Sequence, residues 1–367
     1  MKDKVQVSFY VNGTRRELNV KPYWNLLRAL REELGITSVR EGCSEGECGA
    51  CTVLLNGEAV SSCLVLASSL NQDDQVTTLE GIGDNGALHP LQESFHNHGA
   101  AQCGFCTPGI ILSSKSLLDQ NPEPSREEIS EAISGNLCRC TGYVKPIEAI
   151  YSTSRGSVAP HEPDEGAGRE ESGFSVVGKS ALRVDGEDLV TARTRYVDDM
   201  AFPNMLHAKA LLSKHHHALI RKLDVSKAES LPGVAAVLTA KDVPNNMYGG
   251  GIKDQPCLCE DRVRHLGDIV AVVAAEDPDI AEEAVKLIEV EYEELPAVFD
   301  PMEAMEPDAV QIHPHGNFVP GPAGPNKNRW QVRKGDVEAG LKEADLIIED
   351  TFTTPMCEHV HIEPHVA

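Results

Sequence analysis

The sequence predicts an α+β protein built from several domains, and three observations support this. Two groups of four cysteines occur in the first 155 residues, the first among alternating strand patterns and the second among helical patterns. A stretch rich in Gly, Pro and Glu follows, and a mixed α/β pattern begins after it. A chain of 367 residues is long enough to build a separate core for each part.

Residues 1–80 are expected to form a small α+β unit. Apolar residues alternate on both sides of an Asn-Gly pair, which predicts a β-hairpin over residues 4–20. Leucines on one face predict a helix over 24–34, with a glycine as its stop. A second hairpin is expected over 52–60 and a last strand over 76–79.

Residues 84–155 are expected to be all-helical. Ser125 and Glu128 have the spacing of a capping box, in which the two residues satisfy each other's backbone donors at a helix start. A proline in the first turn marks two of the other helices. The four predicted helices are Pro90–His98, Gly109–Asp119, one after Ser125, and one opened by Pro146.

Residues 156–172 have no apolar period and read as a solvated linker. A mixed α/β domain is expected over 173–305, and a second loose stretch opens the last part, 306–367. The predicted elements of the mixed domain are buried strands at Val234–Leu238 and Ile269–Ala274 and a helix over Asp279–Val290 whose end turns into a strand.

The first cysteine group has the spacing of a plant-type [2Fe–2S] site, C-x4-C-x2-C and a more distant fourth cysteine. Its members are Cys43, Cys48, Cys51 and Cys63. Iron favours soft thiolate ligands, and interleaved glycines let the loop adopt positive φ and direct its N–H groups towards sulfur. These glycines are Gly42, Gly46 and Gly49. The alternatives are a zinc site or buried thiols, but zinc sites usually show two short C-x2-4-C knuckles.

The second cysteine group is a C-x2-C pair with a distant C-x-C pair, a pattern that taken alone suits either iron or zinc. Its members are Cys103, Cys106, Cys138 and Cys140. The first pair precedes a predicted helix start, where the helix dipole favours a negatively charged centre. Together with the first group, this favours two iron–sulfur clusters and a path for single electrons.

The formal net charge of −24 argues against nucleic acid or an anionic membrane as a partner. No apolar run approaches the length of a membrane span, and the N-terminus lacks a signal-peptide pattern. A cytoplasmic location follows as the default. In that reducing compartment the cysteines are expected to be thiols or metal ligands.

Three other groups favour structural explanations. His359, His361 and Glu363 alternate like a two-histidine, one-carboxylate metal site, but we expect no metal there. The run His215–His217 is expected to be solvated, because consecutive residues cannot all face one ion. The remaining cysteines are expected to be buried thiols: Cys257, Cys259 and Cys357.

Three motifs in this order, CSEGECGACTV, QCGFCTPGI and NLCRCTGY, resemble the iron–sulfur portion of the molybdenum hydroxylases, the family of xanthine dehydrogenase and aldehyde oxidoreductase. The resemblance implies a β-grasp ferredoxin-like domain, then an all-helical [2Fe–2S] domain. It continues through VGKSALRVDGEDLVTARTRYVDDM, which looks like the family's α/β hammerhead domain. KGDVEAGLKEADLIIEDTFTTP looks like the entry to the molybdenum-cofactor domain.

By this resemblance the eight cysteines bind two [2Fe–2S] clusters, and Gln102 and Cys140 match positions that lie against the molybdenum-pterin cofactor. The family oxidises an aldehyde or N-heterocycle with oxygen from water, and electrons leave through the clusters. Only the linker stands where relatives carry an FAD domain. The implied partners are a molybdenum-cofactor domain or subunit and an external acceptor such as a flavin subunit, flavodoxin or ferredoxin. The family also suggests a homodimer when complete.

The chain stops at Ala367, before the residues that match the family's catalytic glutamate, so we expect no catalytic residue within it. We therefore interpret the chain as a fragment, a truncated product or one subunit of a split enzyme. A stand-alone electron carrier is the alternative, although a pure carrier has no need of a hammerhead domain. A zinc-binding interaction module is the non-redox alternative.

Overall fold

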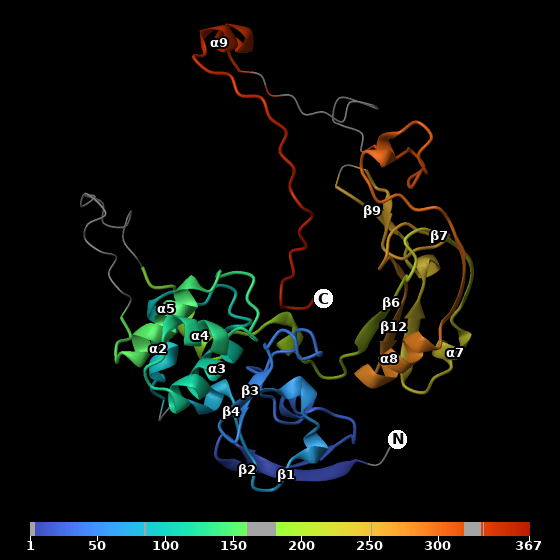
Figure 1. The fold of residues 1–367 in the computed structure, drawn as a ribbon. Helices are drawn as coiled ribbons and strands as arrows, with labels where there is room; N and C mark the ends of the chain where they lie inside the picture. The colour runs from blue at the N-terminus through green and yellow to red at the C-terminus, as the bar shows by residue number, and fades with distance from the viewer. Residues whose placement is uncertain (1–3, 84–85, 160–180, 251, 319–331, 333) are drawn as a thin grey trace. The chain divides into compact units, whose positions relative to one another are not determined.

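The computed structural model describes residues 4–83, 86–159, 181–250, 252–318, 332 and 334–367. The chain divides into two compact units, which are described separately below (Figure 1). The first unit holds residues 1–200 together with 353–367, and the second holds 201–352.

The first unit contains a five-stranded mixed sheet in the order β2-β1-β5-β3-β4. The expected hairpin over 4–20 is confirmed, and its Asn12-Gly13 turn has positive φ at both residues. Strand β1 runs parallel to β5 and antiparallel to β2, which fits the expected β-grasp fold. The strands are β1 (Val5–Val11), β2 (Thr14–Val20), β3 (Thr52–Leu55), β4 (Glu58–Ser61) and β5 (Gln75–Thr77).

A short helical segment covers this sheet and closes its core. The predicted leucine face is confirmed, since Leu26, Leu27 and Leu30 are buried against the apolar side of the hairpin. Asn25 caps the helix start by accepting a hydrogen bond from the Arg28 N–H. The segment consists of α1 (Leu26–Arg28) and a π-helical turn, η1 (Ala29–Glu33), and later turns are η2 (Ser62–Leu64), η3 (Ala67–Ser69) and η4 (Leu79–Gly81).

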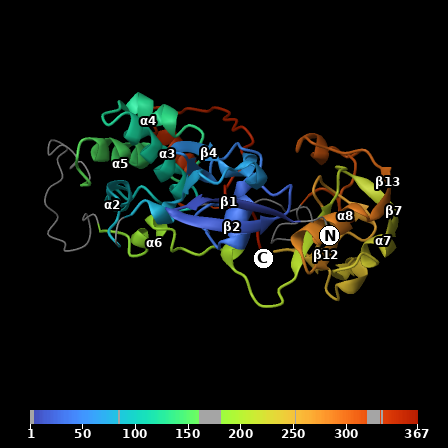
Figure 2. The same ribbon diagram turned by 90° about the horizontal axis from the view of Figure 1, so that it is seen from below.

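The all-helical part of the first unit packs around its own core (Figure 2). The capping box at Ser125 and Glu128 is confirmed, with both reciprocal hydrogen bonds present. Leu54 of the sheet joins the helical core, so the two cysteine-bearing parts share buried surface. The helices are α2 (Pro90–Asn97), α3 (Thr107–Gln120), α4 (Arg126–Ala132) and α5 (Val144–Ser154), followed by α6 (Gly186–Val190) and η5 (Val197–Asp199).

The second unit is a mixed α/β body with two three-stranded sheets, β11-β7-β13 and β6-β12-β8, and a two-stranded ribbon, β10-β9. Helix α8 packs against β6 and β12 through buried alanines. The strands are β6 (His207–Leu212), β7 (Ala218–Asp224), β8 (Val234–Leu238), β9 (Met247–Tyr248), β10 (Gln255–Pro256), β11 (Arg262–Val263), β12 (Ile269–Ala275) and β13 (Glu289–Glu294). The helices and turns are α7 (Ser226–Glu229), η6 (Ala240–Asp242), α8 (Pro278–Lys286), η7 (Glu303–Met305) and α9 (Val337–Glu343).

One sequence-based expectation for this unit needs correction. Strand β12 is buried as predicted, but β8 lies at the sheet edge, where only Val237 is buried. The helix expected over Asp279–Val290 ends at Lys286 and turns into a strand as predicted, because the alternating residues from Glu289 onward pair with β7 as strand β13. Most of the expected linker over 156–172 and much of the second loose stretch lie outside the described residues.

Candidate iron–sulfur centres

The first cysteine quartet is assembled from one loop and one turn of the sheet domain. Cys43, Cys48 and Cys51 lie in the loop that precedes β3, and Cys63 comes from η2 after β4. The thiols form two hydrogen-bonded pairs, Cys43 with Cys48 and Cys51 with Cys63. The backbone N–H groups of Glu45 and Cys48 each donate to Cys43 Sγ at 3.4 Å. The loop therefore already surrounds one sulfur with donors, as a negatively charged cluster requires.

Three glycines let the backbone come close to these thiols, for two different reasons. Gly46 and Gly49 adopt positive φ, as expected, at +82° and +66°. Gly42 does not, and its need is for space, since a Cβ there would lie 2.8 Å from Cys48 Sγ. At Gly46 a Cβ would lie 2.4 Å from Leu64 Cδ1. The loop is thus packed as tightly as a wrapped cluster demands.

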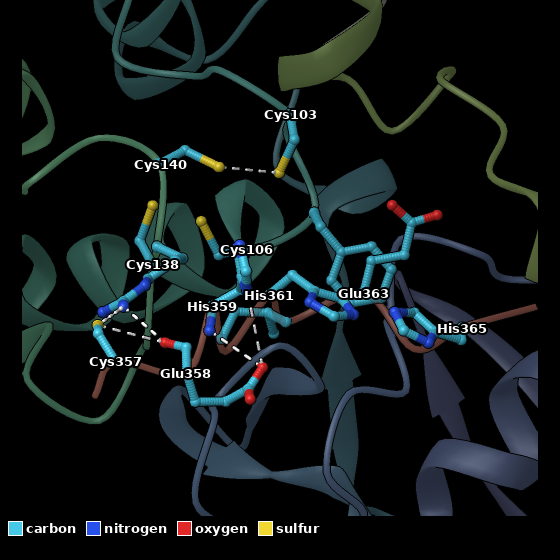
Figure 3. A pocket seen from close by; sticks show the side chains of 13 residues that line it. Cys103, Cys106, Cys138, Cys140, Cys357, Glu358, His359, His361, Glu363 and His365 are labelled. Carbon is cyan, nitrogen blue, oxygen red and sulfur yellow. Dashed lines mark hydrogen bonds and ion pairs between the residues drawn. The ribbon is translucent and has the colours of Figure 1, made fainter. Parts of the chain in front are cut away.

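The second quartet is assembled at a helix start and a helix connection. Cys103 and Cys106 precede α3, with Cys106 at its N-cap, and Cys138 and Cys140 lie between α4 and α5. Figure 3 shows Cys140 beside Cys103, joined by a hydrogen bond, and Cys138 beside Cys106. The Cys103 and Cys140 sulfurs are 3.6 Å apart. The start of α3 and the segment between α4 and α5 therefore bring these four thiols together.

Side chains around the C-x-C pair fix its turn. The Tyr143 hydroxyl accepts a hydrogen bond from the Cys138 N–H at 2.8 Å and donates to the Asn136 carbonyl at 3.2 Å. The Thr141 hydroxyl lies 3.1 Å from Cys138 Sγ. Tyr143 itself has a positive φ of 66°. This backbone conformation costs free energy. The two hydrogen bonds of the Tyr143 hydroxyl, to Asn136 and Cys138, offset that cost.

Burial and hydrogen bonding shift the pKa of several of these thiols. Burial raises the pKa of Cys63 to about 12 and that of Cys103 to about 11. The hydrogen bond from Cys106 lowers the pKa of Cys138 to about 5, and the same bond raises the pKa of Cys106. One thiol of that pair thus holds the proton while the other takes thiolate character. Because thiolates are the metal-binding form, loading a cluster would release protons.

The two quartets are joined by direct hydrogen bonds. The Leu137 N–H donates to the Cys48 carbonyl at 2.9 Å, and Leu137 immediately precedes Cys138. The Asn136 amide donates to the Gly49 carbonyl at 3.0 Å and to Thr52 Oγ1 at 3.1 Å. Asn136 is buried, with 3% of its surface exposed. The backbones of the two cysteine motifs therefore lie in contact, with no side chain between them at this point.

A pocket of about 860 Å³ opens beside the second quartet. The segment 357–365 forms its other wall, and Arg139 Nη2 donates to Cys357 Sγ at 3.1 Å and to the Glu358 carbonyl at 2.8 Å (Figure 3). Cys140 lines this pocket. Gln102 is exposed and is absent from the lining residues, and its carbonyl accepts a hydrogen bond from Arg183.

The expectations for the other candidate residues are only partly met. Cys259 is buried, but Cys257 and Cys357 are exposed, so the prediction of three buried thiols is wrong for two. His217 is also buried, with its Nδ1 2.7 Å from the Pro296 carbonyl, so the histidine run is not fully solvated.

Several residues at these centres were not singled out from the sequence. Asn136 and Tyr143 flank the C-x-C motif and Arg139 lies within it, and their proximity to the cysteines was the available signal. Arg40 lies three residues before Cys43, which was a similar signal. Tyr196 contacts Cys103 from a distant part of the chain, and no local pattern marks it.

Three family profiles match successive parts of the chain. A 2Fe-2S iron-sulfur cluster binding domain matches residues 9–79, and a [2Fe-2S] binding domain matches 78–151. The a/b hammerhead domain of aldehyde oxidase and xanthine dehydrogenase matches 191–296. The chain thus carries two 2Fe-2S binding domains, and an FAD domain is not indicated.

Known proteins match the same parts. The aldehyde oxidoreductase of Megalodesulfovibrio gigas is 34% identical over 382 residues, covering 99% of this chain and 41% of that protein. The nicotinate dehydrogenase small FeS subunit of Eubacterium barkeri is 50% identical over 154 residues, covering 42% of this chain and 98% of that subunit. The crystal structure of the aldehyde oxidoreductase from Desulfovibrio desulfuricans has a TM-score of 0.76 and 38% identity, covering 85% of this chain and 36% of that one.

A protein with two adjoining 2Fe-2S domains followed by a hammerhead domain is an iron–sulfur redox protein of the molybdenum hydroxylase class. The chain belongs to the xanthine dehydrogenase and aldehyde oxidoreductase family, whose aldehyde oxidoreductases carry molybdopterin. Nearly the whole of this chain matches the Megalodesulfovibrio gigas aldehyde oxidoreductase, but the match covers only about two fifths of that enzyme's length. Among the described residues, no helix combines the length and apolar character needed to cross a membrane.

Proposed function

We propose that this chain is the electron-transfer portion of a molybdenum hydroxylase, and that its eight quartet cysteines hold two [2Fe–2S] clusters. The observation that carries the proposal is that each of the two matched 2Fe-2S domains brings four cysteines together. Four thiolates are the ligand set of a [2Fe–2S] cluster. In the first domain Cys43 lies beside Cys48 and Cys51 beside Cys63, and in the second Cys103 lies beside Cys140 and Cys106 beside Cys138.

The clusters, when bound, supply one-electron carriers, and the chain's own residues connect them. The shortest connection in the described contacts runs from the Cys48 carbonyl through the Leu137 N–H to Cys138. It contains a single hydrogen bond between two ligand-bearing backbones. Burial of Cys48, Cys51, Cys63 and Cys106 keeps water from those thiols. The arrangement suits rapid passage of single electrons between two fixed sites.

The pocket beside the second quartet supports a place for the molybdenum-pterin cofactor of the complete enzyme. Cys140 lines this pocket, and so does Cys103, which directly follows Gln102. We propose that Cys140 and Gln102 face the pterin when the molybdenum-cofactor domain or subunit is present. Electrons from oxidation of an aldehyde or N-heterocycle would then enter at the second quartet. They would leave from the first quartet to an external acceptor, such as a flavin subunit, a flavodoxin or a ferredoxin.

A subunit of a split enzyme, or a stand-alone two-cluster carrier, is the second candidate. One observation favours this candidate. The match to the nicotinate dehydrogenase small FeS subunit of Eubacterium barkeri covers 98% of that subunit, which is a separate chain of its enzyme. The hammerhead match over 191–296 favours the first candidate, since it extends well beyond that subunit's length. Isolation of a functional chain without any molybdenum-containing partner would favour the carrier.

The proposal is tested by counting metals and inorganic sulfide in anaerobically reconstituted protein. We expect about four irons and about four sulfides per chain, with the visible absorption of iron–sulfur clusters. One or two zincs per chain and no visible absorption would contradict the proposal and support a zinc-binding module. Replacing the exposed Cys257 by alanine is the matched control, because this thiol belongs to neither quartet and its loss should leave the iron count unchanged.

A further inference from the structure

A tyrosine from a distant part of the chain contacts the second quartet. The Tyr196 hydroxyl donates a hydrogen bond of 2.5 Å to the carbonyl oxygen of Cys103, which is 93 residues away in sequence. This carbonyl belongs to the peptide between Cys103 and Gly104. Gly104 has a φ of +85°, and a Cβ there would lie 2.9 Å from the tyrosine oxygen. The glycine thus leaves room for the hydroxyl to reach the backbone.

Tyr196 also packs against Phe105, which lies between Cys103 and Cys106 of the second quartet. The rings of Phe105 and Tyr196 meet edge to face, with centroids 5.2 Å apart at 87°. The Phe105 N–H in turn donates to the sulfur of Cys103. Tyr196 therefore holds both ends of the short turn from Cys103 to Phe105, the carbonyl through its hydroxyl and the aromatic ring through its edge.

Buried charges hold Tyr196 in place. Arg40 lies over the tyrosine ring, with its guanidinium carbon 4.3 Å from the ring centroid, and is ion-paired with Asp199. Arg40 has 2% of its surface exposed, and the Asp199 side chain has 1%. Asp199 also accepts a hydrogen bond from the Tyr196 N–H at 3.0 Å and pairs with Arg31 at 3.2 Å. These buried ion pairs and hydrogen bonds hold Tyr196 against Arg40 and Asp199, although Arg40 Nε has no hydrogen-bond partner among the described residues.

We propose that Tyr196 is a positioning residue that sets the reduction potential of the second cluster. This inference rests on the proposed function above, since it requires a cluster at Cys103, Cys106, Cys138 and Cys140. The hydroxyl bond draws electron density from the peptide and holds the turn so that the Phe105 N–H points at Cys103 Sγ. Hydrogen bonds to ligand sulfurs stabilise the reduced, more negative cluster and raise its potential.

The test is an EPR-monitored redox titration of the full chain carrying Tyr196→Phe, which removes the hydroxyl and keeps the ring. We expect the midpoint potential of the second cluster to become more negative, while that of the first cluster stays unchanged. The two signals are assigned with Cys140→Ala, which should remove only the second. Tyr151→Phe is the matched control, because Tyr151 lies on α5 with its ring beside Arg126 and Arg155.

Each other outcome overturns the inference in a distinct way. Unchanged potentials for both clusters would show that the hydroxyl does not act on the second cluster. Equal shifts of both would indicate a general structural effect. Loss of the second signal alone would mean that the hydroxyl is required for assembly and does not tune the potential. Absence of two signals in the unmodified chain would refute the proposed function itself, and the inference with it.

Discussion

Gly49 lies in the first cysteine motif and faces the second one. Its backbone conformation is one that residues other than glycine rarely adopt. Its φ is +66°, and a Cβ at this position would lie 2.2 Å from the Gly135 carbonyl oxygen. Asn136 donates to the Gly49 carbonyl, so the glycine also supplies one of the bonds that join the motifs. A single small residue thus allows the first cysteine loop to contact the backbone just before Cys138.

Gly49→Ala should destabilise the chain by about 2 kcal/mol or more, because backbone strain and a clash with backbone atoms add together. Gly57→Ala is the matched control. Gly57 also has positive φ, at +90°, but nothing lies within 4 Å of its added Cβ. The control should cost only the strain, about 1 kcal/mol. Urea unfolding of both variants measures the difference, and equal losses would show that the close approach at Gly49 is not maintained in solution.

Cys140→Ala should remove the second cluster and keep the first. The Cys140 thiol is paired only with Cys103 in its quartet, and the first quartet is built from a separate loop and turn. Iron should fall from about four to about two per chain, with one EPR signal remaining. Iron analysis and EPR of the reduced variant check this. Loss of both clusters together would contradict the assembly of two separate centres.

At the scale of residues, the sequence predicted the grouping of eight cysteines into two quartets, but it did not predict which residues surround them. Cysteine spacing is a local pattern, so both quartets could be grouped from the sequence alone. The contact of Tyr196 with Cys103 depends on how distant segments fold together, and no local pattern records it. The exposure of Cys257 and the burial of His217 were missed for the same reason, because burial is a property of the folded unit.

At the scale of elements, helix α4 directs the chain into the junction between the quartets. The residues that follow it, Gly135 to Leu137, make the hydrogen bonds and contacts to the first cysteine loop. The helix start is fixed by Ser125, whose side chain accepts from the Glu128 N–H, while the Glu128 carboxylate accepts from the Ser125 N–H. That hydrogen bond holds the pKa of Glu128 below its usual range.

Ser125→Ala should reduce stability by about 1 kcal/mol, because the first turn of α4 loses its cap. Ser130→Ala is the matched control, since Ser130 is exposed in the middle of the same helix and alanine is the better helix former. Thermal unfolding of the two variants provides the measurement. A loss as large for the control as for Ser125→Ala would argue against the capping role.

Most elements were predictable because their apolar period and their turns are local features. The first hairpin, with its Asn-Gly turn, and the capping box are examples. The strand predicted after the helix of the mixed domain is present as β13, Glu289–Glu294, which pairs with β7. An error occurred where the position in the sheet decides the outcome, because β8 lies at a sheet edge and is largely exposed.

At the scale of the whole molecule, the order of the parts agrees with an electron-transfer chain. Two 2Fe-2S domains share buried surface, and a hammerhead domain follows them. The net charge of −24 does not suit the binding of nucleic acid, which needs a basic surface. The chain covers 41% of the length of the Megalodesulfovibrio gigas aldehyde oxidoreductase.

The most direct test of two electrically connected clusters is quantitative EPR of the dithionite-reduced full chain, with iron and molybdenum counted on the same sample. The account predicts two distinct S = 1/2 signals, each near one spin per chain, with magnetic interaction between them because the two motifs are joined by backbone contacts. Molybdenum in the sample would identify a bound partner that supplies the active site. A single signal, or an iron-free protein containing zinc, would contradict the account.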